Sequence, residues 1–291
     1  MSDAVVLMAY GSPSRAEDIR PYLEDIREGR PVSDEAVEEL TERYRRIGGR
    51  SPLDEVTERQ RAALEQEVGI PVHLGMKHWR PRIAEAAERA LAGGATRVAG
   101  LVLAPHYSKL SIAGYLERLH GGLGGRAELR FVESWHDHGP FLDVLADRVR
   151  GTDAHVVFTA HSLPERILEL GDPYKDELLE TSRLVAQRAG LEHWSFAFQS
   201  ASPTGEPWLG PDILDELDDL NRQGVRKVLV APVGFVSDHL EILWDIDVEA
   251  RERAAELGLE LDRIESLNDD PAFIQALASL VRNTLGLPST P

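Results

Sequence analysis

Cysteine is absent from the sequence of 291 residues. Disulfide bonds, thiolate zinc sites and cysteine-ligated iron–sulfur clusters are therefore excluded, and any metal must be bound by histidine, carboxylate, tyrosine or backbone oxygen. Long apolar runs are absent too, since none approaches the roughly 20 residues of a membrane-spanning helix. The first residues, MSDAVVLMAYGSP, lack the basic region of a signal peptide. We expect a cytoplasmic protein without a transmembrane segment.

Basic residues are scarce, because 32 Lys and Arg stand against 50 Asp and Glu, which gives a formal charge of −18. Such a surface disfavours nucleic acid as a partner. The sequence has no Gly-x-Gly-x-x-Gly turn and no Walker A loop, and the glycine-rich stretch 47–52 follows a helical pattern rather than a strand. Nucleotide binding is therefore disfavoured as well.

Eight short β-rich apolar runs alternate with longer amphipathic stretches. Near-continuous apolar strands separated by helices indicate parallel sheets covered on both faces. The predicted strands are 4–10, 72–77, 98–105, 129–135, 155–161, 194–200, 227–235 and 259–267.

The second half of the chain repeats the first. The stretch 132–150 aligns without a gap on 264–282, with Glu, Ser, Asp, Phe, Leu, Ala, Val and Arg matched. Two shorter matches occur in the same order, 97–105 with 226–232 and 5–13 with 156–164. Three ordered matches favour a duplication.

The repeat predicts an α/β fold of two similar doubly wound Rossmann-like lobes, residues 1–150 and 151–291, each with a four-stranded parallel sheet. In open α/β sheets, ligands bind beyond the carboxyl ends of the strands. The active-site cleft is therefore expected between the lobes, bordered by Tyr10, His161 and Glu241.

Three carboxylates, Glu241, Asp245 and Glu249, recur every four residues in HLEILWDIDVE. On an α-helix this spacing places them on one face, where like charges repel. A solvated helix face is one explanation. Apolar residues around most of the circumference favour a buried helix instead, and buried carboxylates must be paired, protonated or bound to metal.

Two histidines follow apolar strands, His161 in VVFTAHSLP and His106 in LAPHYS. A histidine within a strand is most often structural, but at its carboxyl end it is well placed as a base or ligand. His106 ranks lower because no acidic partner lies near it in the sequence. Histidine with carboxylate and no sulfur suits a divalent first-row metal such as iron(II).

Arginines concentrate in an otherwise acidic chain, in IREGR and in RYRRIGGRSP. Charge-assisted hydrogen bonds from such a cluster suit the carboxylates of a ligand. Alternatively, these side chains only balance neighbouring Asp and Glu. The six positions are Arg27, Arg30, Arg43, Arg45, Arg46 and Arg50.

The ordered motifs resemble those of the ferrochelatases, and most closely the soluble bacterial coproporphyrin III ferrochelatases. The resemblance covers the whole chain and includes VLMAYGSP, RYRRIGGRSPL, GMKHW, LAPHYSKLSIAGY, TAHSLPERI, GDPYKDEL, PWLGPDI and PVGFVSDHLEILWDID. It implies two Rossmann-like lobes with a porphyrin cleft between them.

The resemblance implies roles for single residues. His161 and Glu241 would face each other at the metal-insertion site, and Tyr10 would bind the iron of the product from the opposite face of the macrocycle. Asp245 and Glu249 would continue a path for protons or iron. Porphyrin and its propionates would be held by Tyr10, Arg27, Arg43, Tyr44, Ser51 and Tyr115.

The implied activity is insertion of Fe(II) into coproporphyrin III to give Fe-coproporphyrin III (coproheme) in haem biosynthesis, with iron as substrate and no permanently bound cofactor. A downstream coproheme decarboxylase is a candidate partner. The alternatives are a protoporphyrin IX ferrochelatase, a cobalt or nickel chelatase for another tetrapyrrole, and a haem carrier. The His161–Glu241 pair argues against a carrier, which needs no base opposite its axial ligand.

Overall fold

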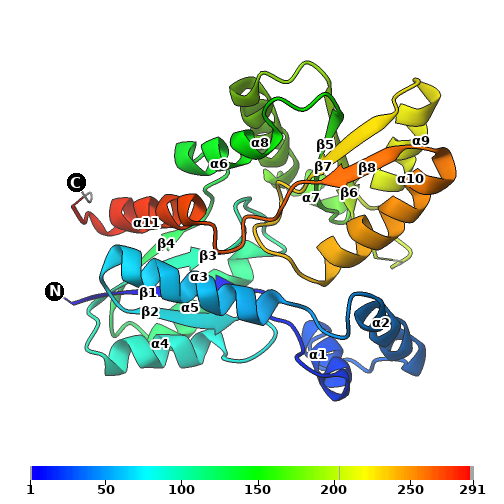
Figure 1. Cartoon of the computed structure of the whole chain (residues 1–291). Helices are drawn as coiled ribbons and strands as arrows, with labels where there is room; N and C mark the ends of the chain where they lie inside the picture. The colour runs from blue at the N-terminus through cyan, green and yellow to red at the C-terminus, as the bar shows by residue number, and fades with distance from the viewer. Residues whose placement is uncertain (1, 203, 289–291) are drawn as a thin grey trace.

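Eight strands form two separate four-stranded parallel sheets, in the order β2-β1-β3-β4 and β6-β5-β7-β8. The computed structural model describes residues 2–202 and 204–288, and Figure 1 shows one sheet in each lobe. The strands are β1 (Asp3–Ala9), β2 (Val72–Met76), β3 (Arg97–Val102), β4 (Glu128–Val132), β5 (His155–His161), β6 (Trp194–Gln199), β7 (Lys227–Ala231) and β8 (Glu260–Arg263). The identical order in the two lobes confirms the predicted fold class.

Several strands end earlier than predicted. β3 ends at Val102, before the Ala104-Pro105 pair, and β7 ends at Ala231, directly before Pro232. Proline has no N–H for a ladder hydrogen bond, so Pro105 and Pro232 do not continue a strand. The apolar residues that follow are thus released from the sheets toward the cleft.

The helices follow ordinary start and stop signals. Ser33 caps α2 by accepting a hydrogen bond from the N–H of Ala36 at 3.3 Å, as expected of an N-cap serine. The helices are η1 (Ala16–Asp18), α1 (Ile19–Ile26), α2 (Asp34–Arg46), α3 (Leu53–Val68), α4 (Ile83–Ala92), α5 (Ile112–Leu123), α6 (Gly139–Val149), α7 (Arg166–Glu169), α8 (Tyr174–Ala189), α9 (Ile213–Arg222), η2 (Ile242–Ala250), α10 (Arg251–Leu257) and α11 (Pro271–Leu285). None in the described ranges is both long and apolar enough to cross a bilayer.

The two halves exchange their last helices. α6 packs against α8 of the second half, while α11 packs against α3, β3 and β4 of the first, as the position of the red α11 in Figure 1 shows. Phe141 of α6 and Phe273 of α11 are both fully buried in one core shared by the two sheets. The predicted boundary at residue 150 separates the two sheets. α6 and α11, however, each pack against elements of the other half, and this exchange joins the lobes through one core.

The acidic helix η2 is a π-helix, which corrects the expected α-helix. At its end the N–H of Arg251 donates to the carbonyl of Ile246, five residues earlier. π-helices are rare and frequently occur at functional sites. With the wider turn, residues four apart still lie on the same side, so the carboxylates keep a common face. The predicted burial is confirmed, because Ile242, Asp245 and Ile246 are buried.

Candidate active site

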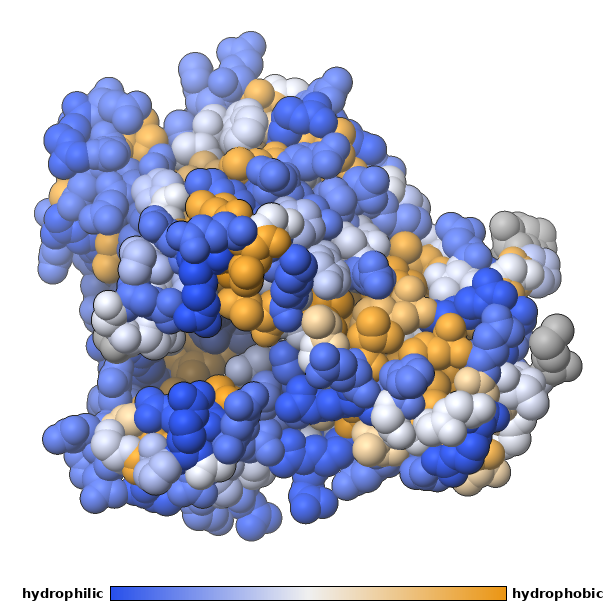
Figure 2. All heavy atoms as spheres, turned by 180° about the vertical axis from the view of Figure 1, so that it is seen from behind, coloured by the Kyte–Doolittle hydropathy of each residue, from blue (hydrophilic) through white to orange (hydrophobic). Residues whose placement is uncertain are grey.

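A cavity of about 340 Å³ lies between the lobes at the carboxyl ends of the strands. Its volume is in the range of small-molecule sites. Figure 2 shows this hollow from behind, with hydrophobic residues at its floor and hydrophilic ones at its rim. Tyr10, His161 and Glu241 all line it, as the strand topology predicted.

Close packing at the strand ends brings the acidic helix to His161. A Cβ on Gly234 would lie 2.4 Å from the Cβ of Ala160, so only glycine allows the turn after β7 to rest on the end of β5. The N–H of Gly234 donates to the carbonyl of Thr159 at 3.1 Å. This contact places the following segment, and Glu241 with it, beside His161.

His161 faces Glu241 across the inner end of the cavity, with Nε2 3.6 Å from Oε1. The Nδ1 of His161 bonds to the carbonyl of Ser162, and the Tyr174 hydroxyl donates to the carbonyl of His161 at 2.9 Å. A carbonyl can only accept, so Nδ1 carries the proton. The other ring nitrogen, Nε2, faces Glu241 at the cleft, and in the neutral form of the ring it can accept a proton or bind a metal.

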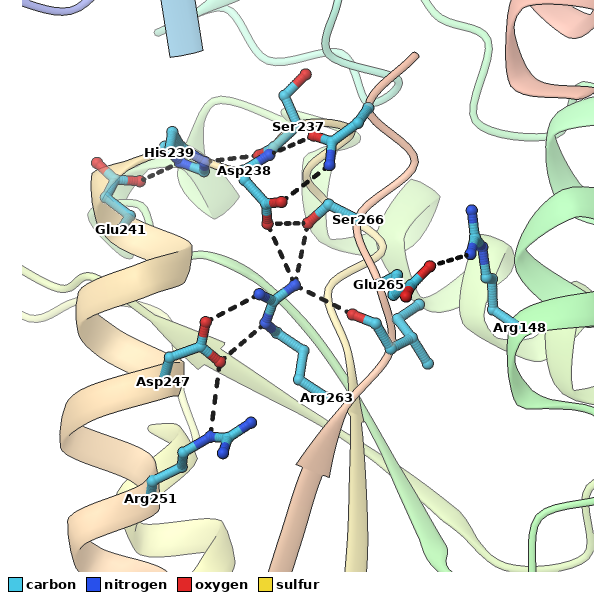
Figure 3. A network of polar contacts seen from close by, with 12 residues as sticks. Arg148, Ser237, Asp238, His239, Glu241, Asp247, Arg251, Arg263, Glu265 and Ser266 are labelled. Carbon is cyan, nitrogen blue, oxygen red and sulfur yellow. Dashed lines mark hydrogen bonds and ion pairs between the residues drawn. The ribbon is translucent and has the colours of Figure 1, made fainter. Parts of the chain in front are cut away.

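A second histidine, His239, completes this arrangement, and the sequence analysis did not single it out. Its Nε2 lies 3.5 Å from Oε2 of Glu241, and its Nδ1 donates to the carbonyl of Ser237 at 2.9 Å. Figure 3 shows this contact at the start of the π-helix. Its place two residues before Glu241 in SDHLE was the available signal.

The two histidines keep Glu241 ionised. Burial raises its pKa, but the charge of His161, the hydrogen bond and charge of His239 and the more distant Arg43 outweigh burial and lower the pKa to about 2. The side chain is deep among atoms of both lobes, yet 36% of it is reachable through the cleft. A carboxylate so placed can meet a cation that enters the cleft.

Asp245, one turn along the π-helix, has the opposite character. It is 6% exposed, and burial together with the charges of Glu241 and Glu249 raises its pKa to about 7, against the hydrogen bond from Ser200. Asp245 therefore exchanges protons near neutral pH. Glu249 is half-buried and lies another turn along the same helix.

Tyr10 lies at the end of β1 on the opposite lobe, and 41% of its surface is exposed in the cleft. Surrounding protein atoms, then Glu241 and Asp25, raise the pKa of its phenol. The ring packs on His78 at 4.7 Å between centroids, and Asp25 accepts a hydrogen bond from Nδ1 of His78 at 3.0 Å. The phenol is thus held neutral until a cation or base draws its proton.

The residues implied to hold a porphyrin divide into two groups. Tyr44, Ser51 and Tyr115 line the cavity, whereas Arg27 and Arg43 are outside its lining. Arg27 is exposed. The Arg43 guanidinium pairs with the Glu39 carboxylate at 2.7 Å, so its charge already has an acidic partner.

Most of the other clustered arginines also have acidic partners. Arg45 pairs with Glu42 and Arg50 with Glu55, at 2.6 and 2.8 Å. Arg46 pairs with Glu252 of the other lobe and lies over the Trp244 ring, 5.1 Å from its centroid. The alternative of local charge balance therefore describes Arg45 and Arg50, whereas Arg46 links the two lobes.

An exposed arginine on α5, Arg118, was missed by the sequence analysis. Its charge acts on Tyr10 and on Tyr115, which places it near the cleft. Within residues 2–202 and 204–288 it has no recorded carboxylate partner. It is thus a cation open to an anionic ligand, although nothing in the spacing of SIAGYLERL set it apart.

Two solved structures share this two-lobed architecture over nearly their whole length. "SirB from Bacillus subtilis with Fe3+" aligns over 98% of this chain and 96% of its own, with a TM-score of 0.62 and 13% identity. "The structure of CbiX, the terminal Enzyme for Biosynthesis of Siroheme in Denitrifying Bacteria" aligns over 96% and 98%, with a TM-score of 0.54 and 12% identity. These likenesses define the fold, that of two similar α/β lobes around a cleft.

The chain belongs to the ferrochelatase family, whose profile matches residues 2–285. The ferrochelatase of Herpetosiphon aurantiacus is 44% identical over 96% of this chain and 97% of its own. The coproporphyrin III ferrochelatase of Geobacillus kaustophilus is 42% identical over 95% and 94%. The membership confirms the expected family and the expected class of enzyme, a ferrochelatase of porphyrin and haem biosynthesis.

Proposed function

We propose that this protein inserts Fe(II) into coproporphyrin III to give Fe-coproporphyrin III. The observation that carries the proposal is the pair of His161 and Glu241, 3.6 Å apart, on the wall of a cleft that Tyr10 borders from the other lobe. A flat macrocycle between these walls would present one face to a base and a carboxylate and the other to a phenol.

The porphyrin must lose two pyrrole protons as iron enters. The Nε2 of His161 accepts such a proton, and the Glu241 carboxylate stabilises the resulting imidazolium. General bases in enzymes contribute about 10²–10⁴-fold to the rate. Asp245, with its pKa of about 7, then takes up protons from the inner end of the cleft and passes them toward Glu249.

The same acidic face serves incoming iron. Imidazole nitrogen and carboxylate oxygen suit Fe(II), and the remaining ligands are water and the pyrrole nitrogens. In the described parts of the chain, no three His, Asp or Glu side chains form a group that could hold a metal ion. Iron is thus proposed as a passing substrate that His161 and Glu241 deliver.

Tyr10 is proposed to bind the iron of the product from the other face. A phenolate is a hard anionic donor and prefers ferric iron. Because burial and nearby carboxylates raise its pKa, the phenol stays neutral beside a free-base porphyrin. Insertion of Fe(II) for two protons leaves the macrocycle core uncharged, so the phenolate would form once an external oxidant such as dioxygen has taken one electron from the product iron, and the phenol proton would leave to water.

The choice of coproporphyrin III rests on relatives and on charge. A coproporphyrin III ferrochelatase is 42% identical, although relatives that are 44% and 45% identical carry the broader name ferrochelatase. Coproporphyrin III has four propionates and protoporphyrin IX has two. Arg27, Arg30 and Arg118 have no recorded carboxylate partners in the described residues, and Tyr44, Ser51 and Tyr115 add neutral donors at the cavity.

An anaerobic assay with both porphyrins tests the proposal. Loss of free-base porphyrin fluorescence on addition of Fe(II) would be followed, with the His161→Ala variant as control. We expect kcat/KM for coproporphyrin III to be at least about tenfold higher, a difference of about 1.4 kcal/mol in the barrier. Preference for protoporphyrin IX would refute the substrate, and metal insertion only into sirohydrochlorin would refute the iron–porphyrin assignment. Tight haem binding without insertion would indicate a carrier.

A further inference from the structure

The segment that carries His239 and Glu241 is fastened by Asn268, in the loop after β8. The N–H of Asn268 donates to the carbonyl of Val236 at 2.8 Å. Its side chain accepts from the N–H of Asp238 and donates to the Asp238 carboxylate, both at 2.9 Å. Asn268 has a φ of +44°, a left-handed conformation that asparagine adopts more readily than most residues other than glycine.

Further bonds of Asp238 tie the segment to the π-helix, as Figure 3 shows. Asp238 accepts from the Ser266 hydroxyl at 2.6 Å and pairs with Arg263 at 3.3 Å. Arg263 also binds both oxygens of Asp247, in the middle of the π-helix, at 3.0 and 2.9 Å. Within its own lobe the segment is thus held at both ends.

One buried side chain connects this network to the other lobe. Gln60 of α3 is 0% exposed, and its Nε2 donates to the Ser237 hydroxyl at 3.0 Å and to the carbonyl of Asn268 at 2.7 Å. The Asn268 carbonyl can only accept, so it fixes the orientation of the amide. Leu53 and Thr57, earlier on the same helix, line the cavity.

We propose that Gln60 is a positioning residue for metal insertion. It sets the distance between the cavity wall on α3 and the His239–Glu241 pair, although Gln60 itself is outside the cavity lining. This inference rests on the proposed function, in which Glu241 delivers the metal. A displacement of reacting groups by about 1 Å can cost about 10²-fold in rate. The hydrogen bond of Gln60 is made to Ser237, which is only two residues before His239. Loss of that bond would therefore displace His239 and Glu241.

The matched test compares Gln60→Met with Arg59→Ala. Methionine has nearly the length of glutamine and lacks the amide. Arg59 links the same two elements through an exposed pair with Asp269 at 3.1 Å, without touching the segment. We expect Gln60→Met to lower kcat at least about tenfold, with KM and Kd for the porphyrin within about twofold. Arg59→Ala should leave kcat near that of the wild type.

A second variant keeps the test decisive if Gln60→Met does not fold. Ser237→Ala removes only the hydroxyl that Gln60 contacts, and it should also lower kcat at unchanged KM. The double variant should be no slower than Gln60→Met, because contacting residues are not additive. Unchanged kcat in Gln60→Met, or in Ser237→Ala where the former is unfolded, would overturn the proposal.

A readout without turnover separates this inference from the proposed function. The imidazole NMR signals of His239 should shift in Gln60→Met and stay in place in Arg59→Ala. Wild-type protein inactive on both porphyrins would count against the proposed function, while the His239 signals would still decide the role of Gln60. Unmoved signals would show that Gln60 does not position the pair.

Discussion

Replacing Asp245 by asparagine should make the protein more stable at alkaline pH. The buried carboxyl has a pKa raised from 3.8 to about 7 in the folded state, so folding binds its proton more tightly. Below both pKa values the carboxyl is protonated in the folded and in the unfolded state, so it does not lower the free energy of unfolding. As the pH rises from about 4 to about 7, the unfolded chain ionises first and the folded state is increasingly disfavoured. Above about pH 7 the carboxyl is ionised in both states, and the loss of folding stability no longer grows.

The magnitude follows from the shift. At about 1.36 kcal/mol for each pKa unit, a rise from 3.8 to about 7 corresponds to about 4 kcal/mol. Relaxation and water entry around the charge reduce such figures, and asparagine loses part of the bond from Ser200. Urea unfolding should therefore show the advantage of Asp245→Asn over the wild type growing by about 1–3 kcal/mol between pH 5 and pH 8.

The control is Asp262→Asn, an exposed carboxylate on β8, whose effect should be small and independent of pH. A difference between Asp245→Asn and the wild type that stays constant from pH 5 to pH 8 would refute the reasoning. In that case Asp245 ionises as easily in the folded protein as in the unfolded chain. Its part in proton transfer near neutral pH would then lose its basis.

Three further outcomes are expected. His161→Ala should lower kcat by about 10²-fold or more while porphyrin binding, measured by fluorescence quenching, persists; near-normal turnover would remove His161 from the mechanism. Glu241→Gln should suppress insertion more than Glu249→Gln, because Glu241 borders the cavity. Equal and small effects would indicate that both carboxylates belong only to a solvated helix face. Tyr10→Phe should alter the visible spectrum of the ferric product complex, and an unchanged spectrum would exclude Tyr10 as ligand.

The sequence alone determined the architecture, because strand and helix patterns are local and the repeat doubles their signal. Eight apolar runs predicted eight strands, and the parallel topology placed Tyr10, His161 and Glu241 at one cleft. That step needed only the rule that parallel strands present their carboxyl ends at one edge. The strand ends were predicted less well, since apolar residues after Val102 and Ala231 line the cleft instead of joining a ladder.

The tertiary structure decided what depends on distance between remote segments. The acidic stretch forms a π-helix, a rare hydrogen-bond pattern that local helix propensity does not predict. Ion pairs occupy Arg43, Arg45, Arg46 and Arg50, although their spacing equally allowed ligand binding. Gln60 and Ser237 are 177 residues apart and yet share a buried hydrogen bond. No local pattern encodes such a contact, because it exists only when two lobes, joined by exchanged helices, pack around one cleft.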